Sequence, residues 1–345
     1  MELEAALRDQ VERATRKGAA GKEIRKLKGD ASNRSYYRVG APPDSHVLMV
    51  MPKDAAKKSE EATKGEPPKE LPFVNVHRYL RALGVRVPEI LRYDEPAGMM
   101  VLEDLGDLTF EQALDGGRRR EELYTRAVDL LARMRVRAER EQDDSCIAFG
   151  RAFDEELYGW ELHHFREWGM EAWSGRRPPA AERAELDAIF RGIARELSAA
   201  PRGFTHRDYQ SRNLMVKDGE LVVIDFQDAL LGPRQYDLVA LLRDSYVELD
   251  RPFVERMLDR YLQTFEREGG APADRGAFVA FFDLLTVQRK LKDAGRFEYI
   301  HRVKGNPGFL VSIPASLRYV KDAFGRRPEL SRLREIVSGY VPELA

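Results

Sequence analysis

The sequence predicts an α+β protein with a small antiparallel β-sheet lobe near the N-terminus and a larger, mainly helical lobe after it. Three observations carry this prediction. Short β-favouring runs separated by turn residues dominate residues 24–105. Apolar residues at helical spacing dominate from residue 119 onward. The length of 345 residues is that of two domains at ~100–200 residues each. We therefore expect an N-terminal lobe over 1–105 and a C-terminal lobe over 106–345.

The N-terminal lobe is expected to begin with an amphipathic helix, because Leu3, Leu7 and Val11 recur every four residues. The elements predicted after it are antiparallel strands within 24–51, a mobile Lys- and Pro-rich loop over 52–72, a helix over 73–83 closed by Gly84, and a hairpin over 89–106 around Pro-Ala-Gly. In the first of these segments we expect a turn near residues 29–32, where Gly29 and Asp30 stand together.

The C-terminal lobe is expected to be helical, apart from one hairpin over 203–228 whose turn is the Asp-Gly pair at 218–219. Helices are predicted at 119–141, 153–170, 181–198 and after Pro252, where Phe253, Met257, Tyr261 and Phe265 form an apolar stripe. Within the second of these helices, the rings of Trp160, Phe165 and Trp168 are expected in the core.

Composition excludes several classes of protein. The 57 basic and 58 acidic residues give a net charge of −1, which argues against general attraction to nucleic acid or membranes. The lone cysteine, Cys146, excludes a disulfide framework within the chain and is not placed for zinc binding. The first residues lack the apolar segment of a signal peptide, and no run is long enough to span a membrane. We expect a cytoplasmic protein.

The residues that carry chemistry are His206-Arg207-Asp208, then Asn213, then Asp225 at the end of the apolar run LVVID. Phosphoryl transfer from ATP needs a carboxylate that orients the acceptor hydroxyl and accepts its proton, together with oxygen ligands for Mg²⁺. Asp208 is the predicted catalytic base, and Asn213 and Asp225 are the predicted metal ligands. The spacing between an Asp, an Asn five residues later and a strand-terminal Asp is specific for this chemistry. The competing interpretation is that these carboxylates only cap a turn and a strand.

The segment resembles the aminoglycoside phosphotransferase branch of the kinase-like phosphotransferases, which carries His-x-Asp-x₄-Asn and then Ile-Asp-Phe. The longer string HRDYQSRNLM…VIDFQDALLGPRQYDLVALLRDSY, together with GDASNRSYYRV and VQRKLKDAGRFEYIHR, resembles the bacterial N-acetylmuramate/N-acetylglucosamine anomeric kinases of cell-wall recycling. The likeness covers residues from about 24 to about 335. It implies a two-lobed protein-kinase-like fold and an ATP- and Mg²⁺-dependent kinase that forms a sugar 1-phosphate.

The resemblance also implies roles for residues of the N-terminal lobe. The first hairpin turn would lie over the ATP phosphates, with the residues Gly29, Asp30, Ala31, Ser32 and Asn33. The segment that includes Glu103 and Leu105 matches the hinge, whose backbone binds adenine, so that the side chains of Glu103 and Asp104 need not touch the base. Asp237 matches an acidic residue that braces the catalytic loop.

One position departs from the family pattern. The third strand of these kinases usually carries a Lys that pairs with the α- and β-phosphates, and Met51 stands at the corresponding place. Lys28, Arg34 and Lys53 are the candidates for the missing cation. The departure leaves open the alternative of a nucleotide-binding pseudokinase.

The acceptor is predicted from charge. Segment 283–304 is rich in Arg and Lys, which would repel a cationic aminoglycoside but could bind the lactyl carboxylate of N-acetylmuramate. Arg212 is the first choice for an acceptor or phosphate contact, and Arg207 and Arg289 are further candidates for contact with the acceptor. Gln227 and Asp228 follow the predicted metal ligand Asp225 and could bind sugar hydroxyls or a second Mg²⁺. An aminoglycoside-, choline- or ketosamine-type kinase is the alternative within the same reaction class.

Overall fold

The computed structural model describes residues 2–27, 34–52, 70–114 and 117–345. The chain forms two compact units, one of residues 1–113 and 214–227 and the other of residues 114–213 and 228–345. The two units are defined by how compactly the chain packs. The two lobes expected at residues 1–105 and 106–345 are defined by function, and they stay a prediction. The predicted phosphate-covering turn lies outside the described residues, as do most of the predicted loop over 52–72 and two candidate cations, Lys28 and Lys53.

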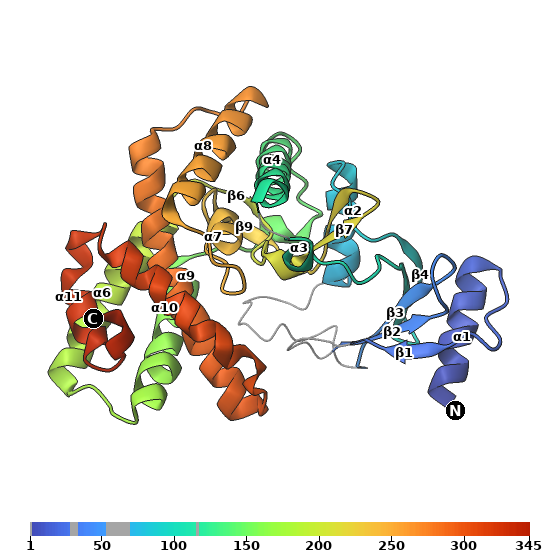
Figure 1. The fold of residues 1–345 in the computed structure, drawn as a ribbon, viewed down its shortest axis with the longest axis horizontal. Coiled ribbons are helices and arrows are strands. Elements are labelled where there is room, and N and C mark those ends of the chain that lie inside the picture. The colour runs from blue at the N-terminus through green and yellow to red at the C-terminus, as the bar shows by residue number, and fades with distance from the viewer. Residues whose placement is uncertain (1, 28–33, 53–69, 115–116) are drawn as a thin grey trace. The chain divides into compact units, whose positions relative to one another are not determined.

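The first unit is built on a five-stranded antiparallel sheet of order β1-β2-β3-β5-β4 (Figure 1). Its strands are β1 (Ile24–Lys26), β2 (Ser35–Val39), β3 (His46–Val50), β4 (Ile90–Asp94) and β5 (Met99–Glu103). Both strand pairs predicted from the sequence are confirmed. The chain crosses from β3 to β4 through α2 (Pro72–Ala82), and β5 then inserts between β3 and β4.

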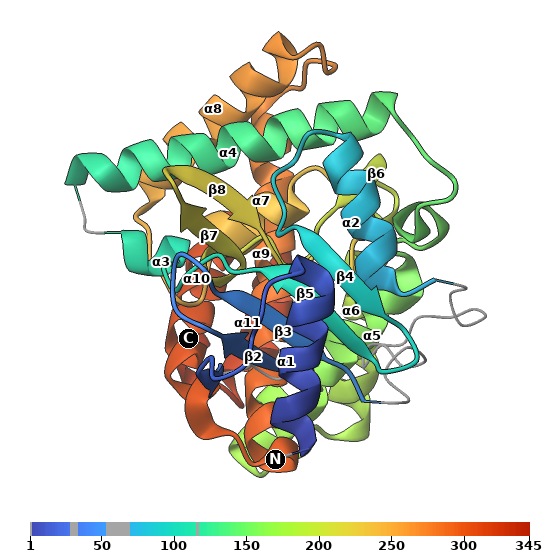
Figure 2. The same cartoon turned by 90° about the vertical axis from the view of Figure 1, so that its right-hand side faces the viewer.

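Helix α1 (Glu2–Thr15) covers one face of this sheet, as the turned view also shows (Figure 2). Leu7 and Val11 are fully buried against Val39, Leu48 and Val101 of the sheet. Each such side chain contributes about 1.5–3 kcal/mol of hydrophobic stabilisation. The first member of the predicted apolar stripe, Leu3, is instead 42% exposed, so the packed face begins one turn later.

Helix α2 ends as its sequence predicts. Gly84 has φ +71°, and its N–H donates to the carbonyl of Arg81 while the next N–H, of Val85, donates to Leu80. This is the Schellman arrangement, in which a left-handed residue satisfies the last carbonyls of a helix.

The predicted hairpin over 203–228 is confirmed in its central part, as β7 (Leu214–Lys217) and β8 (Glu220–Val223). Its turn residues Asp218 and Gly219 have φ +51° and +78°, the two positive values that a type I′ turn requires. The hairpin joins the first unit, where Val216 donates to the carbonyl of Leu108 and Val223 to that of Arg86. The short helix α3 (Phe110–Ala113) adjoins β7.

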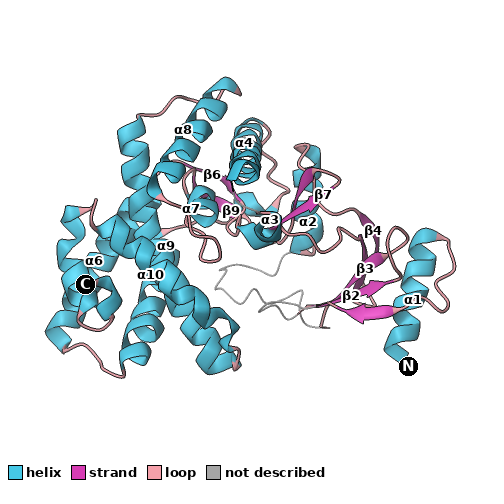
Figure 3. Ribbon diagram, in the orientation of Figure 1, coloured by secondary structure: helices cyan, strands magenta, loops and turns pink. Residues whose placement is uncertain are grey.

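The second unit is mainly helical, as Figure 3 shows. Its longer helices are α4 (Gly117–Arg140), α5 (Glu155–His164), the π-helix η3 (Phe165–Ala172), α6 (Ala180–Ser198), α7 (Tyr236–Leu242), α8 (Arg251–Arg267), α9 (Arg275–Lys304), α10 (Ile313–Phe324) and α11 (Ser331–Ser338). Short 3-10 turns lie at Ile147–Gly150, Ser211–Asn213, Pro307–Ser312, Pro328–Leu330 and Pro342–Leu344. Strands β6 (Arg202–Thr205) and β9 (Leu230–Pro233) form an antiparallel pair in this unit.

The helix predictions for this unit are confirmed with one correction. The stripe of α8 is buried throughout, and Phe165 is fully buried. Trp160, however, is 37% exposed, and Trp168 is only partly buried, so the prediction that both lie in the core is wrong for Trp160. The helix also changes from α to π at Phe165, which changes the direction in which later side chains point.

Across the described ranges, none of the helices combines the length and the apolar character needed to cross a lipid bilayer.

Candidate active site

The predicted catalytic segment, residues 206–213, follows β6 in the second unit and is held by a buried carboxylate. Asp237, in the first turn of α7, accepts hydrogen bonds from the backbone N–H groups of His206 at 2.8 Å and Arg207 at 2.9 Å. Burial raises the pKa of the Asp237 carboxyl, while the nearby His206 and the backbone donor oppose that rise. The two bonds allow Arg207 to adopt φ +79°, a conformation that non-glycine residues rarely take. The bracing role predicted for Asp237 is confirmed.

Asp208 follows this strained residue and meets a buried arginine. Nη2 of Arg289 lies 3.2 Å from Oδ1 of Asp208, and Nη1 of the same guanidinium donates to the carbonyl of Arg207 at 2.8 Å. The side chain of Asp208 keeps 33% exposure, whereas that of Arg289 keeps 2%. One arginine therefore holds both the backbone before the carboxylate and the carboxylate itself.

The charges around Asp208 keep it ionised. Burial acts to raise the pKa of the Asp208 carboxyl, but the positive charges of Arg289 and Lys292 outweigh burial, and the pKa lies below its ordinary value. Lys292, one turn along α9, is itself buried and pairs with Asp293 at 3.4 Å. A carboxylate with these neighbours is an anion at neutral pH and can accept a hydrogen bond.

The side chains of Arg207 and Arg289 are buried in the second unit. Arg207 is 4% exposed; its Nη2 lies 3.8 Å from Oε1 of Glu161, and its guanidinium lies over the ring of Phe153. Arg289 is equally buried and holds Asp208, as described above. Both guanidinium groups thus lie in the interior, next to the predicted catalytic segment. Their predicted contact with substrate stays a prediction.

Asn213 closes the catalytic segment in the second unit. Its Nδ2 donates to the backbone carbonyl of Asp208 at 2.9 Å, a bond that ties the two ends of the segment together. The same bond assigns the amide oxygen to the opposite side of the side chain. Next to it, Ser211 donates its backbone N–H to Oδ2 of the buried Asp244 at 2.8 Å. Asp244 is therefore a second brace, which the sequence analysis missed although it lies in the RDSY string.

Asp225 belongs to the first unit and follows β8. It is exposed, has φ +63°, and its Oδ1 accepts a hydrogen bond from Nε2 of Gln227 at 2.9 Å. The following Phe226 is fully buried, with its ring 4.8 Å from that of Phe73. The buried ring of Phe226 and the positive φ of Asp225 together turn the Asp225 side chain outward. Non-glycine residues with positive φ cluster at functional sites.

The remaining predicted contacts are placed as follows. Arg212 stacks on Tyr246, with the guanidinium carbon 3.6 Å from the ring centroid. Gln227 is buried and donates a hydrogen bond to Asp225, and its contact with a sugar hydroxyl stays a prediction. Asp228 is partly buried, and its charge acts on the neighbouring Arg151.

The predicted hinge carries two carboxylates that the protein itself engages. Glu103 accepts hydrogen bonds from Arg86 and from Lys217 Nζ, the latter at 2.8 Å. Burial acts to raise the pKa of Glu103, but these two cations lower it to about 2. Asp104 accepts from Ser45 at 2.6 Å and pairs with the buried Arg38 at 2.7 Å. These contacts engage both carboxylates within the protein, and the binding of adenine by the hinge backbone stays a prediction.

The departure at Met51 stands out clearly in the first unit. Met51 is 8% exposed, and its N–H donates to the carbonyl of Gly98 at 2.9 Å. Arg34 is the one candidate cation of the three that falls within the described residues. Its side chain hydrogen-bonds Tyr36, whose hydroxyl is also close enough to Asp225 to sense its charge. Arg34 therefore lies in the neighbourhood of a predicted metal ligand.

The oxygen donors fit a hard divalent cation. Mg²⁺ is usually held by one or two protein oxygens, with water and phosphate oxygens completing its shell. The carboxylate of Asp225 and the amide oxygen of Asn213 are ligands of this type. In the part of the chain that the structure describes, no group of three His, Cys, Asp or Glu side chains is placed to hold a metal ion.

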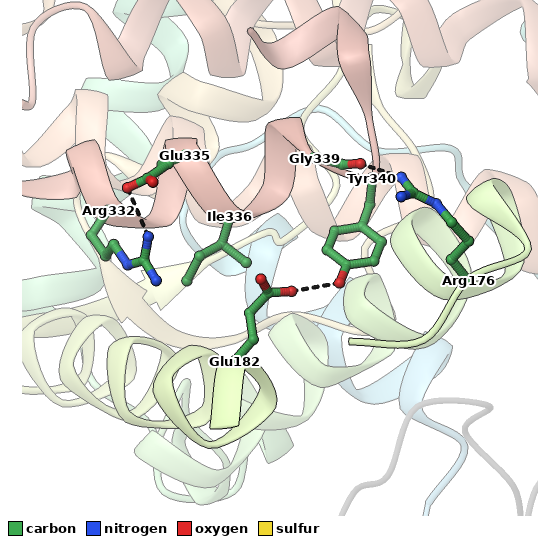
Figure 4. Close-up of a pocket in the computed structure, with 7 residues that line it drawn as sticks. All are labelled: Arg176, Glu182, Arg332, Glu335, Ile336, Gly339 and Tyr340. Atoms are coloured by element: carbon green, nitrogen blue, oxygen red, sulfur yellow. Dashed lines mark hydrogen bonds and ion pairs between the residues drawn. The ribbon is translucent and has the colours of Figure 1, made fainter. Parts of the chain in front are cut away.

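A separate pocket of about 220 Å³ lies in the second unit and contains none of the predicted site residues (Figure 4). Its polar groups are largely satisfied by one another: Tyr340 donates its hydroxyl to Glu182, Arg332 pairs with Glu335, and Arg176 donates to the carbonyl of Gly339. We assign this pocket to packing between α6 and α11.

The brace by Asp237 makes a testable prediction. In Asp237→Ala, the N–H groups of His206 and Arg207 lose their acceptor, and an unsatisfied buried donor is costly. Hydrogen exchange at these two amides should accelerate by at least about tenfold, measured by mass spectrometry or NMR.

Asp250→Ala provides the control, because Asp250 caps α8 through the N–H of Phe253 at 2.7 Å. That variant should lose about 1 kcal/mol of stability yet leave exchange at His206 and Arg207 unchanged. Unaltered exchange at these amides in Asp237→Ala would contradict the bracing role.

Known proteins with similar sequences cover almost the whole chain. N-acetylmuramate/N-acetylglucosamine kinase of Pseudomonas aeruginosa is 34% identical over 319 residues, which are 92% of this chain and 88% of that protein. The proteins of the same name from Pseudomonas putida and Neisseria meningitidis are each 31% identical; the alignments cover 90% and 88% of this chain and 86% of each relative.

Solved structures show the same fold at low identity. Choline kinase LicA from Streptococcus pneumoniae gives a TM-score of 0.62 at 14% identity, covering 94% of this chain and 100% of that one. The ADP-bound aminoglycoside phosphotransferase APH(2'')-Ib gives 0.59 at 14% identity, covering 93% and 99%. The expectation of a kinase-like α+β fold is thereby confirmed.

The family model described as the phosphotransferase enzyme family matches residues 23–273, well over half of the chain. Together with the relatives at 31–34% identity, this match shows that the protein belongs to the phosphotransferase enzyme family.

Proposed function

We propose that this protein transfers the γ-phosphoryl group of ATP to the anomeric hydroxyl of N-acetylmuramate or N-acetylglucosamine. The observation that carries the proposal is the presentation of Asp208 as a partly exposed, ionised carboxylate on a segment fixed by Asp237 and Arg289. The printed names of relatives at 31–34% identity over about nine-tenths of the chain supply the acceptor class.

In the proposed reaction Asp208 accepts a hydrogen bond from the anomeric hydroxyl. The bond between the sugar oxygen and the γ-phosphorus forms while the bond from that phosphorus to the bridging oxygen of ADP breaks. The hydroxyl proton passes to the Asp208 carboxylate late in the step, as in other phosphoryl transfers. The products are ADP and the sugar 1-phosphate. The lowered pKa of Asp208 suits the early part of this step, because only the anion can orient the hydroxyl.

Asn213 and Asp225 would hold Mg²⁺, which supplies positive charge beside the ATP phosphates when bound. The β7–β8 register pairs Leu214 with Val223, so the start of one strand lies beside the end of the other. Asn213 immediately precedes the first of these residues, and Asp225 follows the second by two positions. Along the chain, both proposed ligands therefore stand next to the same end of the hairpin.

The charges near Asp208 favour a neutral or anionic acceptor. Arg289 and Lys292 of α9 both act on its carboxylate, and Arg207 adds a third positive charge. Burial raises the pKa of the nearby Glu161 carboxyl, which reduces the negative charge that could offset these cations. These cations would repel a polycationic acceptor and attract an N-acetylated sugar acid.

The test is phosphate transfer with a panel of acceptors in the presence of ATP and Mg²⁺. N-acetylmuramate and N-acetylglucosamine should be phosphorylated, with a phosphorus NMR signal coupled to the anomeric proton. Choline, an aminoglycoside and a ketosamine should give little or no product, because each carries a cation. A phosphate signal at any hydroxyl other than the anomeric one would overturn the proposed reaction.

Asp208→Asn in the same assay separates catalysis from binding. Turnover should fall by at least about 10²-fold, since the amide cannot accept the proton. The Kd for ATP should stay within about threefold of the original, because the change leaves ground-state binding groups in place. Near-normal turnover in this variant would exclude Asp208 as the base.

Arg289 is proposed as a positioning residue, and its role has a pH signature. Asp208 has a lowered pKa in the folded protein, so activity that needs its anion is lost only as the pH falls through that lowered value. Arg289→Met removes both the positive charge and the two-point hold, so it raises the pKa of Asp208 and moves the acid limb of kcat/KM to higher pH. Arg289→Lys removes the two-point hold but keeps the charge, so it should move the acid limb less. We also expect kcat to fall about 10- to 100-fold, as misplacement of a catalytic group does.

The matched control is Arg243→Lys, at another arginine that is 2% exposed and pairs with an aspartate, Asp322, at 3.0 Å. Arg243→Lys should cost comparable stability and leave the acid limb in place. An acid limb that does not move in either Arg289 variant would show that Arg289 is only structural.

A further inference from the structure

Four aromatic rings gather where α5 and η3 meet α9 in the second unit. The ring of His164 stacks on Trp160 at 5.2 Å with an interplanar angle of 17°, and it meets Tyr299 edge-on at 5.3 Å. Trp168 also meets Tyr299, at 5.2 Å and 78°. We call Trp160, His164, Trp168 and Tyr299 the ring cluster. Three of its members keep solvent exposure, with Trp160 at 37%, so the cluster is not a closed core.

Close helix packing fixes the ring cluster. A Cβ on Gly295 of α9 would come within 2.8 Å of the Cα of Phe165, and one on Gly169 within 3.2 Å of the Cα of Gly295. Only glycine permits this approach, which holds the π-helix against α9. π-Helical turns are rare in proteins, and those that occur are often found at functional sites. The π-helix therefore makes this region a candidate for a function besides packing.

One face of α9 connects the ring cluster to the catalytic carboxylate. Arg289, Lys292, Arg296 and Tyr299 follow at offsets of three, seven and ten residues, which place them on one face of a helix. Arg289 contacts Asp208, and Tyr299 belongs to the ring cluster. The rise of an α-helix puts Arg296 about 10 Å along the axis from Arg289, comparable to the length of a substituted amino sugar.

Positive charge accompanies the rings. The guanidinium of Arg296 lies 5.2 Å from the centroid of Tyr299. Burial lowers the pKa of His164 to about 4, and the charges of Arg296 and Lys292 add to that effect. His164 is therefore neutral at physiological pH. The cluster is an uncharged aromatic surface with an arginine at its edge.

This combination matches one kind of ligand. The C–H face of a pyranose ring packs on aromatic side chains, whose faces are large and apolar. A carboxylate is bound well by a guanidinium, which presents paired donors. N-acetylmuramate carries both features, a pyranose ring and a lactyl carboxylate, whereas N-acetylglucosamine carries only the first.

We propose that the ring cluster and Arg296 form the acceptor-sugar subsite, with Trp168 and Tyr299 under the sugar and Arg296 on the lactyl carboxylate. This inference rests on the proposed function and adds the residues that distinguish the two sugars. The subsite lies wholly within the second unit, as does Asp208.

The decisive variant is Arg296→Gln, assayed by steady-state kinetics with both sugars. Loss of a charged hydrogen bond corresponds to a change of about tenfold or more. The KM for N-acetylmuramate should therefore rise at least about tenfold more than the KM for N-acetylglucosamine, with the KM for ATP unchanged. Equal effects on both sugars, or none, would overturn the assignment of Arg296.

Arg302→Gln is the matched control, because Arg302 lies on the same helix, pairs with Glu298 and is half exposed. It should leave the ratio of the two KM values as it is. Trp168→Ala, in turn, should raise the KM for both sugars by a similar factor. An unchanged KM for both sugars in Trp168→Ala would exclude the ring cluster from the subsite.

Failure of this inference is distinguishable from failure of the proposed function. If the unaltered protein phosphorylates neither sugar, the proposed function falls, and the subsite falls with it. If the unaltered protein phosphorylates them, but Arg296→Gln keeps its sugar preference and Trp168→Ala leaves both KM values unchanged, only the subsite is wrong.

Discussion

The structure depends on one buried carboxylate that holds a strained segment in place. Asp237 binds two consecutive backbone N–H groups, and this allows Arg207 to take a left-handed conformation that directs the next residue, Asp208, toward solvent. Arg289 completes the arrangement by joining the carbonyl of Arg207 to the carboxylate of Asp208. The carboxylate that we propose as the base is thus positioned by residues that are themselves buried.

Charge distribution gives the second constraint. Helix α9 supplies buried cations on the face that leads from Asp208 to the ring cluster, while burial weakens the negative charge of Glu161. The same charges keep Asp208 ionised and, in the proposed function, oppose cationic acceptors. Base activation and acceptor choice are therefore linked through one helix in this account, and a change of charge on α9 would alter both.

Several elements of the fold could be predicted from the sequence, because the residues that determine them are neighbours in the chain. The Asp-Gly turn after β7, the Schellman glycine after α2 and the apolar stripe of α8 each follow from neighbouring residues. The role of Arg289 could not be predicted in this way, since its partners lie about 80 positions earlier in the chain. Trp160 was misplaced because an aromatic residue at helical spacing does not reveal that the helix face it occupies is solvent-exposed.

The most direct measurement is a crystal structure of the complex with a non-hydrolysable ATP analogue, Mg²⁺ and N-acetylmuramate. The account predicts a carboxylate oxygen of Asp208 about 2.6–3.2 Å from the anomeric oxygen of the sugar, the reach of a general base. An anomeric oxygen held by a different side chain, with Asp208 directed elsewhere, would contradict the central claim.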